Sequence, residues 1–254
     1  NLSASFGAAV GLTYEDGIER GRQESLGAEF RHEPPEQLSL DTALWDGRGD
    51  LHKSFGPRDL FDWIYAVLHA PSYRTRYAEF LKSDFPRVPT PGSLKLLQAL
   101  VPLGRDLVAL HLLRPGEAPV LNDPAKFDPS IRYVGSPNPR IGKKATSRGG
   151  YPQWVNGKVM INETCWFEDV PKETYEFQVG GYTPLKKWIE DRAESGGKKA
   201  KQGRVLTDED ILHYRRVVVA LTETRRLMAE IDKVIEAHGG WPGAFQTGEA
   251  NGKT

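Results

Sequence analysis

The residue types between positions 126 and 158 suit the recognition of duplex DNA. This stretch carries seven basic side chains against the single acidic Asp128, a net charge of +6, together with Ser, Thr, Asn, Gln, aromatic residues and several glycines. Arg can bind guanine O6 and N7 through two hydrogen bonds, Asn and Gln match adenine, and Lys neutralises phosphates. A solvated loop has a similar composition, and composition alone weighs the two interpretations evenly.

A second basic stretch, residues 186–204, has seven basic side chains against three acidic ones, a net charge of +4. Its loop, residues 195–203, is rich in Gly and Lys and holds only Gln202 as a side chain suited to reading bases, so we expect it to contact phosphates. The first 50 residues have ten acidic and four basic side chains, and the whole chain has no net charge. The distribution of charge therefore indicates more about a partner than the total does.

The catalytic motifs of DNA-modifying enzymes are missing from this sequence. A DNA methyltransferase needs a Gly-rich loop and a polar-Pro-Pro-aromatic motif, and the nearest Gly-rich candidate, residues 6–11, follows no apolar strand. No Lys has Asp or Glu two positions before it, as in many metal-dependent nucleases. The single Cys165 lies in an apolar stretch and is interpreted as a core residue, and the six His lack zinc-site spacing. We expect no catalytic residue, metal or cofactor in this fragment.

Helices are predicted in the first half of the chain, where apolar residues recur at helical spacing. One covers residues 57–70 between two prolines, and a second covers residues 73–81. A third begins after a Ser cap and covers residues 93–113, with a kink expected at Pro102. These helices form a framework on which a binding surface can be mounted.

Strands are predicted after Pro115, where short apolar runs alternate with turn residues. Asn156-Gly157 between two such runs is a strong hairpin signal. The predicted strands are residues 131–134, 151–155, 158–161, 165–167 and 175–179. Most of the first basic stretch therefore lies on or between strands.

Two helices are predicted in the last third of the chain. Pro184 begins one that runs through Arg192. Thr207 and Asp210 have the spacing of a capping box, and a long amphipathic helix follows over residues 211–235. We therefore expect a long C-terminal helix.

These elements predict an α+β (mixed α/β) fold. We expect a helical framework, a strand-rich recognition part and the long C-terminal helix. No run of 18 uncharged apolar residues and no basic leader is present, so we expect neither a membrane helix nor a secretory signal, and a cytoplasmic location. The expected segments are an irregular acidic part (1–55), the framework (56–114), the recognition subdomain (115–182), a helical part (183–238) and a flexible tail (239–254).

Two long segments resemble the C-terminal specificity region of type ISP single-chain restriction–modification enzymes. They are residues 59–89, DLFDWIYAVLHAPSYRTRYAEFLKSDFPRVP, and parts of residues 177–232, including FQVGGYTPLKKWIEDR. The resemblance implies that a nuclease, a helicase-like ATPase and an adenine methyltransferase lie upstream in the parent polypeptide. It implies that the parent uses S-adenosylmethionine, ATP and Mg, and leaves no catalytic residue to assign in this chain.

Our first hypothesis is therefore a module that recognises double-stranded DNA and contacts the upstream methyltransferase and helicase-nuclease domains, with no membrane partner. The alternative is an interaction or scaffold module that docks on the methyltransferase core, and a free-standing enzyme is a third. For the first hypothesis, the expected base-reading residues are Arg140, Arg148, Gln153 and Asn156. The expected phosphate-binding residues are Lys143, Lys144, Lys158, Lys198, Lys199, Lys201 and Arg204.

Overall fold

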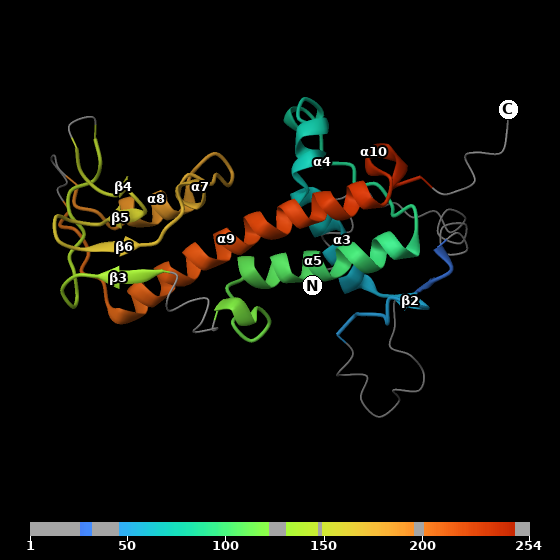
Figure 1. Ribbon diagram of the computed structural model, residues 1–254, viewed down its shortest axis with the longest axis horizontal. Coiled ribbons are helices and arrows are strands. Elements are labelled where there is room, and N and C mark those ends of the chain that lie inside the picture. The colour runs from blue at the N-terminus through green and yellow to red at the C-terminus, as the bar shows by residue number, and fades with distance from the viewer. Residues whose placement is uncertain (1–25, 32–45, 122–130, 147–148, 196–200, 247–254) are drawn as a thin grey trace. The chain divides into compact units, whose positions relative to one another are not determined.

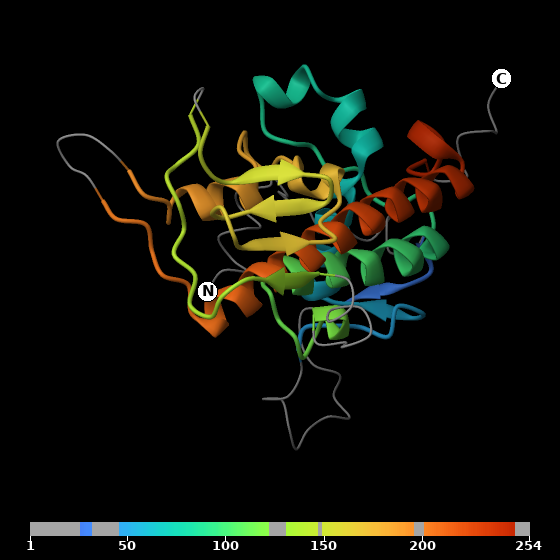
Figure 2. The same cartoon turned by 60° about the vertical axis from the view of Figure 1, so that its left-hand side comes forward.

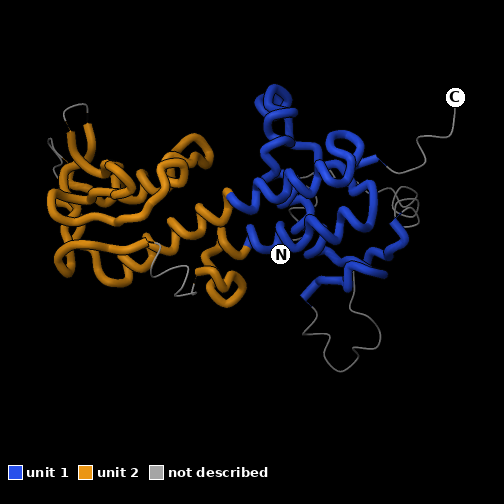
Figure 3. The backbone as a smooth tube through the Cα atoms, viewed as in Figure 1, with its two compact units in different colours: residues 1–108, 226–254 blue, residues 109–225 orange. Residues whose placement is uncertain are grey.

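The computed structural model describes residues 26–31, 46–121, 131–146, 149–195 and 201–246 (Figures 1 and 2). Helices and a small antiparallel sheet confirm the predicted α+β class. The chain divides into two compact units: unit 1 is residues 1–108 with 226–254, and unit 2 is residues 109–225 (Figure 3). The segments predicted from composition differ from these units, which are defined by contacts within the fold. Both unit boundaries fall inside helices, α5 (Leu94–His111) and α9 (Asp208–Ala237).

Unit 1 contains a short parallel ladder between β1 (Glu29–Phe30) and β2 (Ser54–Phe55). α3 (Pro57–His69) follows and confirms the first predicted helix. It starts at a proline, which loses nothing there because the first N–H groups of a helix have no partner within it. Asp59 accepts a hydrogen bond from the Gly56 backbone N–H at 2.9 Å, which fixes the first turn.

The second predicted helix is shorter than expected. α4 (Pro71–Arg76) ends early, and a 3₁₀ turn, η3 (Phe80–Lys82), follows it. Ser93 caps α5, since its Oγ accepts the N–H of Leu96 at 3.2 Å. The helix continues through Pro102.

α5 approaches α3 closely in unit 1. A Cβ atom on Gly104 would lie 1.9 Å from the backbone oxygen of Asp62 in α3. Only glycine allows this separation, so Gly104 sets how closely the two helices pack.

Aromatic side chains fill much of the unit 1 core. Trp63 and Tyr73 are almost fully buried, and the Trp241 and Phe245 rings stack with centroids 4.1 Å apart. The sequence predicts a flexible tail over residues 239–254, but its described part contains a short helix, α10 (Gly240–Gly243), and Phe245 after this helix is buried. Residues 239–246 are therefore folded, because their aromatic rings complete the core.

A buried group of charges lies beside the start of α3. Asp59 and Asp62 are 0% and 2% exposed, and the Arg48 guanidinium bonds Asp62 and lies 3.5 Å from Asp59 Oδ1. Asp59 Oδ2 also accepts the Gly49 N–H at 2.6 Å. Arg105 approaches both carboxylates, at 3.7 and 3.8 Å. These contacts fasten the segment before α3 to the helix.

Unit 2 is built on a four-stranded antiparallel sheet with the strand order β3-β6-β5-β4, which Figure 2 shows. One residue from each strand lies in register across the sheet, and these four share one face: Tyr133, Phe167, Val159 and Trp154. Tyr214 of α9 packs on that face, with its ring 4.4 Å from the Phe167 ring. The strands are β3 (Arg132–Val134), β4 (Gln153–Val155), β5 (Lys158–Met160) and β6 (Trp166–Glu168), which confirm four of the predicted strands.

The fifth predicted strand, residues 175–179, is wrong. Pro171 caps a helical turn, α7 (Lys172–Tyr175), and Val179 is 46% exposed in a tight turn with Tyr182. The alternating pattern suggests a strand, but no neighbouring strand pairs with it among the described residues.

Both helices predicted in the last third of the chain are present. A 3₁₀ turn, η4 (Pro119–Leu121), precedes the sheet, and α8 (Pro184–Glu190) begins at its proline. Thr207 and Asp210 form the predicted capping box, with reciprocal hydrogen bonds of 3.2 and 3.1 Å. No described helix is long and apolar enough to cross a membrane.

Candidate functional site

The two basic stretches meet in unit 2. The Ile141 N–H donates to the Arg204 oxygen at 3.0 Å, and the Leu206 N–H donates to the Pro139 oxygen at 2.8 Å. A Cβ atom on Gly203 would lie 1.9 Å from the Ile141 oxygen, so glycine is required at this crossing. Unit 2 therefore brings together two basic segments that are distant in sequence.

Further backbone hydrogen bonds extend this pairing. Glu194 donates to Gly142 at 3.0 Å and accepts from Lys144 at 2.9 Å. On the other side, Tyr151 donates to Lys143 at 2.7 Å. The backbone that carries the two lysines is thus held from both sides.

Each basic segment also turns back on itself. Thr146 and Gly149 exchange backbone hydrogen bonds of 2.9 and 3.1 Å, and Ser195 and Lys201 exchange bonds of 2.8 and 3.1 Å. Each segment therefore closes on itself through one isolated antiparallel bridge, and in the first segment Lys144 and Tyr151 form a parallel bridge.

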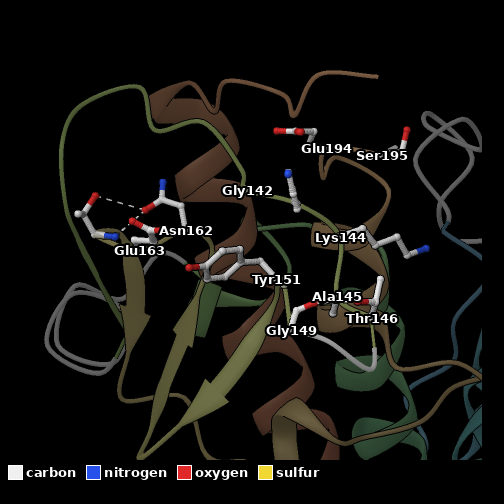
Figure 4. Close-up of a pocket in the computed structure, with 13 residues that line it drawn as sticks. Gly142, Lys144, Ala145, Thr146, Gly149, Tyr151, Asn162, Glu163, Glu194 and Ser195 are labelled. Atoms are coloured by element: carbon white, nitrogen blue, oxygen red, sulfur yellow. Dashed lines mark hydrogen bonds between the residues drawn. The ribbon is translucent and has the colours of Figure 1, made fainter. Parts of the chain in front are cut away.

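An open groove of about 1130 Å³ lies between these segments (Figure 4). Figure 4 shows Asn162 and Glu163 on one side of the Tyr151 ring and Lys144 and Thr146 on the other. The groove's walls combine two lysines with polar side chains and exposed backbone. It is lined by residues 142–146, 149–151, 162–164, 194 and 195.

Two predicted phosphate-binding residues line this groove. Lys143 is exposed and has no carboxylate partner among the described residues. Lys144 is 48% exposed, with its Nζ 3.4 Å from Glu190 Oε2. Both ammonium groups are placed where a phosphate could reach them.

The other predicted phosphate-binding residues differ in their surroundings. Lys201 is exposed in the second basic segment, and Arg204 makes two hydrogen bonds of 2.8 and 2.9 Å to Asp210. Lys158 lies 4.5 Å above the Trp166 ring on the outer face of the sheet, away from the groove. Two further predicted residues, Lys198 and Lys199, lie outside the described part of the chain.

The predicted base-reading residues are not all brought together. Arg140 and Gln153 each donate a hydrogen bond of 2.7 Å to the backbone oxygen of a glycine beside the groove. Asn156 has a φ of 48° in the turn at the far end of the β4–β5 hairpin. Arg148 lies outside the described residues.

One wall of the groove is a turn that sequence reasoning does not predict. Asn162 Oδ1 accepts the N–H groups of Thr164 and Cys165 at 2.9 and 2.8 Å. Asn followed by two polar residues between strands is a turn signal that could have identified it. Cys165 is 1% exposed, which confirms its interpretation as a core residue.

The Tyr151 hydroxyl, which lines the groove, has a pKa shifted by its surroundings. Burial raises the pKa of Tyr151, and the nearby negative charge of Glu163 raises it further. The phenol therefore stays protonated and can donate a hydrogen bond. No cluster of three potential metal ligands occurs among the described residues.

Matches among solved structures include three DNA complexes. The nuclease-deletion mutant of the Type ISP restriction-modification enzyme LlaGI with a DNA substrate mimic is 24% identical, with a TM-score of 0.49, over 69% of this chain and 13% of that one. DNA-bound LlaBIII, an ATP-dependent Type ISP restriction-modification enzyme, is 20% identical, with a TM-score of 0.50, over 71% and 11%. The DrdV–DNA complex is 22% identical, with a TM-score of 0.50, over 69% and 18%.

The chain thus spans less than a fifth of the length of each of these proteins. No curated protein matches it. The family described as the Type ISP C-terminal specificity domain matches residues 13–230. This match covers most of the chain, which therefore belongs to the Type ISP C-terminal specificity domain family.

Proposed function

We propose that this chain recognises a sequence in double-stranded DNA as part of a restriction–modification enzyme. In this proposal it directs the adenine methylation and cleavage that upstream domains perform. The observation that carries it is the open groove where the two basic segments meet, because its lysines can bind DNA phosphates and its exposed polar side chains can reach base edges.

The parent protein supplies the chemistry in this proposal. Its methyltransferase would use S-adenosylmethionine, and its nuclease and helicase-like domains would use ATP and Mg. These groups would bind the upstream domains rather than this fragment, and the enzyme would act in the cytoplasm. The fragment itself would bind the DNA and position it for the upstream domains.

Charge reversal in the groove tests the proposal. The variant K143E/K144E/R148E should lose most DNA affinity in a gel-shift assay, because acidic groups repel phosphates. The matched control is K82E/K95E/K233E, which makes the same change of charge at three exposed lysines of unit 1 that do not line the groove. Circular dichroism would verify that each variant is folded.

Unchanged DNA affinity in the folded groove variant would contradict the proposal. It would favour the alternative, a scaffold module that docks on the methyltransferase core. Turnover by the isolated fragment would instead support a free-standing enzyme.

A further inference from the structure

Several hydrogen bonds hold the turn that lies opposite the lysines. Ile161 donates to the Cys165 oxygen at 3.0 Å, and Asn162 Oδ1 accepts two N–H groups inside the turn. Asn162 Nδ2 also donates to the Arg140 oxygen at 2.9 Å, which joins the turn to the first basic segment. The backbone of Glu163, which lies between these anchors, is therefore fixed in position.

Glu163 is an exposed carboxylate in a groove that we assign to DNA. It lines the groove and forms no ion pair among the described residues. Glu194 also lines the groove, but it is only partly exposed and its backbone bonds the lysine wall. Glu163 is thus the acidic group most available to a ligand.

A carboxylate can approach DNA favourably only where the DNA offers a hydrogen-bond donor. It accepts hydrogen bonds and donates none, and phosphates repel it. In the major groove the donors are the amino groups of cytosine N4 and adenine N6, whereas thymine O4 and guanine O6 and N7 are acceptors. A carboxylate therefore favours cytosine and adenine at the position it contacts and disfavours thymine and guanine.

We propose that Glu163 determines part of the recognised sequence by accepting a hydrogen bond from the exocyclic amino group of cytosine or adenine. The proposal rests on the proposed DNA-recognition function. Tyr151 beside it would add a hydrogen-bond donor to the same site.

Selection of bound duplexes from a randomised library tests this inference. The wild-type chain should select cytosine or adenine at one position. Glu163→Ala should reduce discrimination at that position about 5- to 150-fold, because the acceptor is removed. Glu176→Ala, at an exposed glutamate of unit 2 outside the groove, should leave the selected sequence unchanged.

Modified duplexes separate the two possible bases. If adenine is selected, a purine without the 6-amino group should weaken binding of the wild type but not of Glu163→Ala. If cytosine is selected, a pyrimidinone without the 4-amino group should do the same. Glu163→Asp, which keeps the acceptor, should retain the base preference.

Two results would overturn the inference and can be told apart. If the wild type selects a sequence and the folded Glu163→Ala variant selects it with equal discrimination at every position, Glu163 reads no base. If the wild type binds all duplexes equally, the proposed function fails and the inference fails with it.

Discussion

A buried group of charges in unit 1 and the charges in and near the groove of unit 2 have different surroundings. In unit 1, Arg48 is paired with two buried aspartates. In unit 2, Lys143 and Lys144 line an open groove, and the Arg204–Asp210 pair has an arginine that is 51% exposed. Buried charges must be paired inside the protein, whereas exposed charges remain available to a partner. The difference separates charges that hold the fold from charges that can bind a ligand.

The largest expected effect is a loss of stability when a charge is removed from the buried group of Arg48, Asp59 and Asp62. Arg48→Met should reduce the free energy of unfolding by about 3–5 kcal/mol, because two buried carboxylates lose their closest cation. Chemical denaturation followed by circular dichroism would measure it. A loss below about 1 kcal/mol would show that Arg105 compensates and that the comparison is wrong.

The same substitution in unit 2 should have a much smaller effect. Arg204→Met removes an exposed partner of Asp210 and should cost less than about 1 kcal/mol. The two variants would be compared by the same denaturation experiment. Equal losses would remove the distinction between the units.

The smallest expected effect is the change with pH in the stability that Asp210 contributes. Burial would raise the pKa of Asp210, but hydrogen bonds from Thr207 and the charge of Arg204 together lower it below its ordinary value of 3.8. A lowered pKa means that Asp210 stabilises the fold above pH 3.8 and that this contribution is lost as the pH falls through the lowered value. The stability difference between wild type and Asp210→Asn, measured by denaturation at several pH values, should therefore close in acid.

In unit 1 the pKa of Asp62 is shifted in the opposite direction to that of Asp210. Burial raises its pKa above the ordinary value of 3.8 although Arg48 opposes the shift. Its contribution therefore becomes less favourable as the pH rises from 3.8 through the raised value. Carboxyl NMR titration should place the pKa of Asp62 above 3.8 and that of Asp210 below it, and the reverse order would contradict both assignments.

Local patterns predict much of the fold. The capping box of Thr207 and Asp210 and the Asn156-Gly157 turn are visible in the sequence because each depends on neighbours a few residues apart. The predicted strand at 175–179 is wrong, since alternation alone cannot supply a pairing partner. The resemblance to the family also depends on local segments.

The sequence by itself therefore determined most of the helices, four strands, the basic composition and the family. Tertiary structure alone decided that the two basic segments share a groove, because the backbone of Lys144 bonds that of Glu194, which lies far along the chain, and both residues line the groove. It also decided that Glu163 lines that groove and that Arg48 is paired with two buried aspartates. Such contacts leave no periodic trace in the sequence, since they depend on how distant parts of the chain close on one another.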